Sequence, residues 1–306
     1  MVGMPLTDAE LIDLATSRDI ISIGMLADDV RRQFHGIRTT FVRVAEIAPD
    51  PCAPVRAPAA AGELRIVGVP ASRAAAVERV REVTARGIPV SAFSLADLEQ
   101  LAAQEGITLR ALLEELSAAG LDLVAEAPFD RLADPRRSIE EVNIAGLALA
   151  RLTVWQYPSP DPLPLLKAVA ELQRRVGVVH VFAPLPRQVS AAAPTTGYED
   201  VRRVALARLL VDNVPSIQVD WFLYGPKLAQ VTLTVGADDI DAVSAEEETT
   251  EGRRRAPLEE IRRNIRAAGQ EPFERNGRFE ILRPIDPLGA VPNEAEARHI
   301  QDERAR

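Results

Sequence analysis

LTVWQYPSPDPLPLLKAVAELQRRVGVVHVF, residues 152–182, contains a complete strand–helix–strand unit. Leu152 to Tyr157 is rich in β-branched and aromatic residues, which favours a strand. Apolar residues recur at spacings of three and four from Leu163 to Val176, a pattern typical of an amphipathic helix, and Gly177 suits its end. Val178 to Phe182 is a second apolar run of strand length. The order predicts two parallel strands joined by a helix.

The same alternation extends over most of the chain and predicts an α/β fold, a (β/α)8 TIM-type barrel with an N-terminal helical cap and a C-terminal helix. The other strands are expected at Thr39 to Val44, Leu64 to Val69, Pro89 to Phe93, Leu121 to Ala125, Ile217 to Phe222 and Asp239 to Val243. The other helices are expected at Ala71 to Ala85, Leu95 to Ala119, Ile139 to Ala150, Tyr198 to Asp212 and Pro226 to Val235.

Four segments follow from this reading. They are a helical cap at residues 1–38, the barrel at 39–250, a C-terminal helix with a short extension at 251–283, and a disordered tail at 284–306. The connection from Ala45 to Gly62 is long, has no helical pattern and is rich in alanine and proline. We expect this connection to be disordered or remodelled.

Composition sets the class of protein. The chain has 306 residues, 47% of them hydrophobic and 26% charged, which suits one large domain with a substantial core. A formal charge of −9 argues against a nucleic-acid partner. No apolar run reaches the roughly 18 residues of a membrane span, no secretion signal precedes the fold, and a lone cysteine excludes an intrachain disulfide. We therefore expect a cytoplasmic protein that meets no membrane.

Several segments carry a resemblance to a known family. They are DIISIGMLADDVRR at 19–32, ALARLLVDNVPSIQ at 205–218, GPKLAQ at 225–230, GADDID at 236–241 and the stretch from 258 to 272. Over roughly residues 6 to 282 the chain resembles the radical S-adenosylmethionine (SAM) enzymes aminofutalosine synthase and dehypoxanthine futalosine cyclase of menaquinone biosynthesis. It is more distantly similar to the deazaflavin-forming FO synthase subunits. The resemblance implies a radical SAM barrel and a futalosine-pathway role.

The chain departs from this family where the family binds its cofactors. The resemblance implies a [4Fe–4S] cluster held by a Cys-x3-Cys-x2-Cys loop, because three thiolates bind three irons and leave the fourth for SAM. Here that region offers only Cys52. The glycine pair expected after the second strand reads Val67-Gly68-Val69-Pro70, and the Gly-rich turn expected after the fourth reads Val124 to Phe129. We therefore expect neither [4Fe–4S] nor SAM as a cofactor.

Candidate ligand-binding residues follow the strands, because such barrels bind ligands at the carboxyl ends of their strands. Asp220 is the strongest, since an inward carboxylate is costly unless a base or ligand pairs with it. Arg187 suits a carboxylate or phosphate, although a loop arginine is also often simply solvated. The full set is Asp220, Gln156, Arg187, Glu126, Tyr224 and Asp241, with Ser91, Pro184 and Ser244 at similar positions.

Other chemistries find little support. The histidines are scattered at positions 35, 180 and 299, which does not suit zinc, so no metal site is expected. The chain has no dinucleotide fingerprint, phosphate-binding loop or serine-nucleophile elbow. Catalytic residues stay unassigned.

Two hypotheses remain open. In the first, the chain is a non-catalytic paralogue that binds a nucleoside-type ligand or a menaquinone-pathway enzyme. In the second, it acts on a futalosine-like molecule by acid–base chemistry without a radical, using groups such as Asp220 and Arg187. The first is favoured, since no replacement catalytic constellation is visible.

Overall fold

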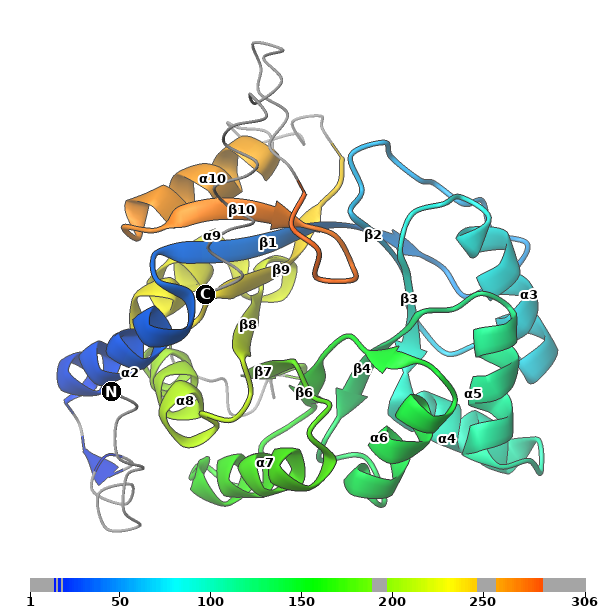
Figure 1. The fold of residues 1–306 in the computed structure, drawn as a ribbon, viewed down its shortest axis with the longest axis horizontal. Coiled ribbons are helices and arrows are strands. Elements are labelled where there is room, and N and C mark those ends of the chain that lie inside the picture. The colour runs from blue at the N-terminus through cyan, green and yellow to red at the C-terminus, as the bar shows by residue number, and fades with distance from the viewer. Residues whose placement is uncertain (1–13, 15, 18, 189–196, 247–256, 283–306) are drawn as a thin grey trace, which may run out of the picture.

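The computed structural model describes residues 14, 16–17, 19–188, 197–246 and 257–282, and these form a closed parallel barrel (Figure 1). The prediction of a (β/α)8 barrel is confirmed. The strands are β1 (Arg38–Ile47), β2 (Glu63–Ile66), β3 (Val90–Ser94), β4 (Leu123–Pro128), β5 (Ala148–Leu149), β6 (Leu152–Val154), β7 (Val181–Pro186), β8 (Ser216–Asp220) and β9 (Asp239–Ser244). β9 pairs with β1 and closes the ring, while β5 and β6 pair with successive parts of β4 and fill one position.

Helices surround the ring of strands (Figure 1). They are α2 (Ile20–His35), α3 (Arg73–Thr84), α4 (Leu95–Gln104), α5 (Leu109–Ala118), α6 (Pro135–Ile144), α7 (Leu163–Val176), α8 (Gly197–Leu210), α9 (Trp221–Thr232), the 3-10 turn η1 (Leu233–Val235) and α10 (Pro257–Ala267). Their apolar faces pack against outward side chains of the strands, such as Leu64, Ile66 and Ile240, in one continuous core. The polar interior of the barrel is therefore separate from the apolar core around it.

The N-terminal helix α2 packs outside the barrel against α8 and η1. The approach is close at Gly24, where a Cβ atom would lie 2.7 Å from Cγ1 of Val235. Residues 1–13, the start of the predicted cap, and the predicted tail at 284–306 lie outside the described residues. Among the described residues, no helix has the length and apolar character of a membrane span.

Three predicted helices differ in the structure. The helix predicted from Pro226 to Val235 begins five residues earlier, at Trp221 of α9, and its last three residues form η1. The helix predicted from Leu95 to Ala119 is two helices, because Gly106 adopts a positive φ of 68° and Thr108 starts α5 by accepting a hydrogen bond from the backbone N–H of Ala111. The helix predicted from Ile139 to Ala150 ends earlier, and the last part of that range forms β5.

The connection from Ala45 to Gly62 has a defined path, in contrast to the expected disorder. Its first residues extend β1 to Ile47. Arg79 of α3, whose side chain is fully buried, donates from Nε to the carbonyl of Ala48 at 2.8 Å and from Nη1 to that of Ala53 at 2.9 Å. One guanidinium thus satisfies two backbone carbonyls of this connection.

The C-terminal segment adds a strand that sequence analysis did not predict. β10 (Glu271–Arg275) pairs in parallel with the N-terminal half of β1, on the edge opposite β9, and lies beside α10 (Figure 1). The turn after it reaches the N-terminal strand ends, where the N–H of Gly277 donates to the carbonyl of Gly62 and Arg278 pairs with Asp122. This turn, residues 276–282, covers the start of β2 to β4, and we call it the floor turn.

Candidate functional site

Strand β2 places two charges inside the barrel. Its sequence Glu63-Leu64-Arg65-Ile66 alternates charged and apolar residues, and successive side chains of a strand point to opposite faces. Leu64 and Ile66 join the outer core, so Glu63 and Arg65 face the interior, where they are only 2% and 6% exposed.

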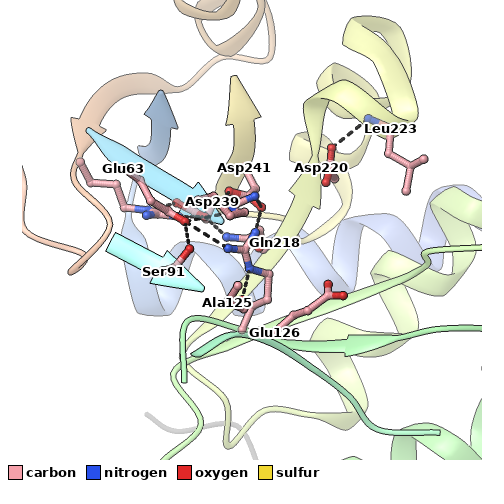
Figure 2. A network of polar contacts seen from close by, with 12 residues as sticks. Glu63, Ser91, Ala125, Glu126, Gln218, Asp220, Leu223, Asp239 and Asp241 are labelled. Carbon is pink, nitrogen blue, oxygen red and sulfur yellow. Dashed lines mark hydrogen bonds and ion pairs between the residues drawn. The ribbon is translucent and has the colours of Figure 1, made fainter. Parts of the chain in front are cut away.

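These two residues belong to a buried group that we call the interior ion cluster: Glu63, Arg65, Arg151 and Asp241. Arg65 contacts Glu63 at 2.8 Å through Nε and Asp241 at 2.7 Å through Nη2. Arg151, just before β6, also pairs with Asp241 and lies 3.5 Å from Glu63. Ser91 of β3 donates to Glu63 at 2.5 Å. Figure 2 shows Glu63, Ser91 and Asp241 gathered within the barrel.

Neighbouring opposite charges keep Glu63 and Arg151 ionised although both are buried. Burial by itself would raise the pKa of Glu63, but Arg65 and Arg151 outweigh it and lower that pKa to about 2. Burial, together with the neighbouring Arg65, lowers the pKa of Arg151 to about 9. Both groups are therefore ionised at neutral pH.

A second buried group lies at the start of β9. Arg275, from β10, contacts Asp239 at 2.7 Å through both Nε and Nη2, a bidentate geometry. Gln218 of β8 donates from Nε2 to Asp239 at 2.7 Å (Figure 2). Burial would raise the pKa of Asp239, yet Arg275 and these hydrogen bonds lower it overall. The C-terminal segment thus supplies a charge to the barrel interior.

The carboxyl ends of the strands carry a third group, the mouth ion group: Glu126, Arg187 and Asp220. Arg187, directly after β7, contacts Asp220 at 2.5 Å and Glu126 at 3.2 Å. Asp220 also caps α9 by accepting from the N–H of Leu223 at 2.8 Å (Figure 2). Burial would raise the pKa of Asp220, but Arg187 and that N–H lower it. The side chains of this group are 12% to 23% exposed, so solvent reaches them.

Five of the predicted site residues lie in or beside the ion groups described above. Asp220, Arg187 and Glu126 come together in the mouth ion group, and Asp241 lies deeper in the interior ion cluster. Tyr224 lies beside them and donates its hydroxyl to the carbonyl of Pro186.

The other candidates have different surroundings. Gln156 is exposed, and its backbone N–H donates to Asp130. Ser244 is exposed and accepts from the N–H of Glu246, whereas the carbonyl of Pro184 accepts from Tyr157. Ser91 is buried beside Glu63.

Sequence analysis missed most of the basic residues inside the barrel. Arg65 had a usable signal, since a charged residue that alternates with Leu64 and Ile66 in a strand must face the opposite side. Arg151 directly precedes a strand, and Arg275 lies in a segment that gave no strand signal, so nothing local marked either one. Their pairing depends on closure of the barrel.

The segment between β1 and β2, where the family resemblance implies a cluster, does not supply its donor set. Cys52 is exposed there, is the only cysteine of the chain, and donates its backbone N–H to Asp50 at 2.9 Å. A [4Fe–4S] cluster open to SAM needs three thiolates. Across the described ranges, no group of three or more His, Cys, Asp and Glu residues is arranged to hold a metal ion. The residues present do not fit the cluster.

The chain is similar in sequence to several known enzymes. The profile of the CofH/MqnC C-terminal region matches residues 183–287. A 5-amino-6-(D-ribitylamino)uracil–L-tyrosine 4-hydroxyphenyl transferase from Methanosphaerula palustris is 28% identical over 58% of this chain and 56% of its own length. The cyclic dehypoxanthine futalosine synthase of Streptomyces coelicolor is 26% identical over 69% and 59%. The aminodeoxyfutalosine synthase of Thermus thermophilus is 27% identical over 67% and 63%.

The matches to these three relatives span between 56% and 63% of their lengths. Among solved structures, methylornithine synthase aligns with a TM-score of 0.64 at 12% identity, covering 88% of this chain and 95% of that one. The [FeFe]-hydrogenase maturase HydG aligns with a TM-score of 0.60 at 12% identity, covering 88% and 72%. At such identity these two structures support the fold alone.

Proposed function

Since the chain belongs to the radical SAM family that includes aminofutalosine synthase and dehypoxanthine futalosine cyclase, we propose that it is a member that works without a radical and binds a nucleoside-type ligand at the barrel mouth. Family members use an iron–sulfur cluster and SAM, and the proposal is that this chain uses neither. The proposed setting is the futalosine pathway of menaquinone synthesis.

The observation that carries the proposal is the donor set after β1. Cys52 can supply one thiolate, whereas the cluster needs three, so no residue arrangement of this chain can complete the site. Val67-Gly68-Val69-Pro70 adds support, because Pro70 has no N–H to offer a ligand where close backbone approach is expected.

The mouth ion group favours binding over acid–base chemistry. A general acid or base works best when its pKa lies near the operating pH. Arg187 and the N–H of Leu223 instead lower the pKa of Asp220 despite its burial, so Asp220 stays ionised. An ionised carboxylate beside a guanidinium is well suited to accept and donate hydrogen bonds to the hydroxyl groups of a ribose.

Titration calorimetry with an aminofutalosine nucleoside and with adenosine tests the proposal. We expect binding to the wild-type protein and at least a tenfold weaker affinity for Asp220→Asn, because the ligand loses an ionised acceptor. Asparagine still caps a helix, so α9 should persist. Asp122→Asn, which changes an exposed pair with Arg278, is the matched control and should bind like wild type.

Two results contradict this function. Absence of nucleoside binding to the wild-type protein would leave association with a pathway enzyme as the role. Unchanged affinity combined with a clear loss of stability in Asp220→Asn would show that Asp220 only holds Arg187 in place.

A further inference from the structure

Among the described residues, two buried polar atoms of the barrel interior lack a hydrogen-bond partner, and a third, Nε of Arg187, lies above them in the mouth ion group at 3.2 Å from Glu126. The first two are Oε1 of Gln218 and Oγ1 of Thr153, and these residues are 1% and 0% exposed. Gln218 uses its Nε2 to donate to Asp239, which leaves its carbonyl oxygen as an acceptor without a donor. Buried polar groups are nearly always paired, with protein, water or a ligand.

Both atoms face the barrel interior from neighbouring parts of its wall. Gln218 alternates with Asp220 on β8, and Thr153 follows Arg151 by two residues, so each points to the interior side. Thr153 is in register with Ala183 of β7, and β7 pairs with β8 at Phe182 and Ile217, one residue before Ala183 and Gln218. Strand β7 therefore lies between the two residues, whose own strands lie about 9–10 Å apart.

The charges of the barrel indicate the kind of group that would complete it. In the buried interior, Glu63, Asp239 and Asp241 are balanced by Arg65, Arg151 and Arg275. In the mouth ion group above them, two carboxylates share one guanidinium, which leaves one negative charge in excess. A partly buried carboxylate in excess favours a cation beside it.

We propose that the barrel interior binds the ammonium group of a small organic amine between Gln218 and Thr153, below the mouth ion group. An ammonium group has three donors and no acceptor, which suits a free amide oxygen and a hydroxyl below a mouth with one carboxylate in excess. A metal ion is disfavoured, since the described residues hold no cluster of three metal-ligating side chains. The inference rests on the proposed nucleoside function in one respect: we expect the ammonium group to be part of the bound nucleoside.

Two nucleosides and one nucleotide that differ only at the 5′ position separate the requirement for a positive charge from nucleoside binding. The probes are 5′-amino-5′-deoxyadenosine, adenosine and adenosine 5′-monophosphate, with propylammonium as a probe that has no nucleoside. By calorimetry, and by ligand-observed NMR for propylammonium, we expect the amino nucleoside to bind at least tenfold tighter than adenosine and the monophosphate to bind least.

Gln218→Met should remove most of that tenfold preference, because it deletes the free acceptor while keeping side-chain volume. Gln173→Met is the matched control: Gln173 is also buried, but it bonds Val179 and Asn213 outside the barrel, so the preference should persist.

The outcomes separate the two ideas. Equal affinity for adenosine and its amino derivative, or a preference that survives Gln218→Met, would overturn the amine site and leave the nucleoside function standing. Binding of propylammonium without any nucleoside would support the amine site and overturn the nucleoside function. No binding of any probe would overturn both.

Discussion

At the scale of residues, the barrel interior contains charges where many parallel barrels contain layers of branched apolar side chains. Glu63, Arg65, Arg151 and Asp241 are each at most 7% exposed at the side chain. Such a cluster is stable only when complete, because desolvation of each ion is offset by its partners. Loss of one member is therefore more damaging than loss of an ordinary surface ion pair.

Glu63→Gln should lower the free energy of unfolding by about 3–5 kcal/mol at pH 7, because Arg65 and Arg151 keep their charges and lose a shared partner. Urea unfolding measures this change. Glu171→Gln, in an exposed pair with Arg174 and Arg175, should cost less than about 1 kcal/mol. Similar losses in the two variants would show that the interior cluster has no special energetic role.

The depressed pKa of Glu63 predicts a pH dependence with a definite sign. Its pKa is about 2 in the folded protein against an ordinary value of 4.5, so its contribution is fully present above 4.5 and is lost as pH falls towards 2. The contribution amounts to about 3 kcal/mol. Between pH 5 and pH 3 the wild type should lose more stability than Glu63→Gln in urea titrations. Parallel curves would contradict the assignment.

Site prediction from sequence succeeded where topology alone decides position. Asp220, Arg187 and Glu126 follow different strands, and a closed parallel barrel brings such positions together at one end. Gln156 was placed by the same argument, but it lies past the end of β6 and is exposed. Which partner each charge takes depends on distances across the barrel, which no local pattern encodes.

At the scale of elements, the C-terminal segment is part of the barrel, although sequence analysis places it after the barrel as a helix with a short extension. β10 contributes Arg275 to Asp239, and the floor turn covers the starts of three strands. Residues 271–275 fall in the short extension expected after the C-terminal helix, and their sequence shows no alternation and contains a proline. Proline is tolerated because β10 is an edge strand.

Arg275→Met tests the anchoring of β10. We expect a loss of about 3–5 kcal/mol in the free energy of unfolding, because Asp239 would keep a buried charge without its bidentate partner. Arg278→Met, which removes an exposed pair with Asp122 in the floor turn, should cost less than about 1 kcal/mol. Thermal or urea unfolding distinguishes the variants, and equal costs would show that burial of Arg275 is unimportant.

Arg79 is expected to decide the order of the segment between β1 and β2. In Arg79→Met the carbonyls of Ala48 and Ala53 lose their donors, and trypsin should cleave at the exposed Arg56 at least tenfold faster than in wild type. Arg81→Met, on the exposed face of the same helix, is the control. Rapid cleavage of the wild-type protein at Arg56 would instead support the disorder expected from composition.

Each of the eight strands expected from sequence overlaps a barrel strand, because short apolar runs separated by helical periods are a strong signal. The match is poorest for Val178 to Phe182, which shares only its last two residues with β7, and the strand expected from Ile217 to Phe222 ends in α9. The ends of the predicted elements were less accurate where a single residue interrupts a helical pattern. Gly106 interrupts the predicted helix from Leu95 to Ala119, and its positive φ belongs to a turn that hydrophobic periodicity does not reveal.

At the scale of the whole molecule, the chain is a (β/α)8 barrel whose interior side chains pair with one another as ions. The family profile covers residues 183–287, the part that supplies the end of β7, all of β8 and β9, and β10. These elements carry Arg187, Asp220, Asp239 and Asp241. The matching region therefore shapes the mouth and interior, whereas the loop after β1 lacks the thiolates that the family's chemistry requires.

Anaerobic reconstitution with iron and sulfide, followed by iron analysis and an assay for reductive SAM cleavage, tests the central claim that this barrel works without a radical. We predict no stable [4Fe–4S] cluster and no 5′-deoxyadenosine above background, because Cys52 is the only thiolate available. About four irons per chain with the absorption of a [4Fe–4S] cluster, together with 5′-deoxyadenosine formation, would contradict it.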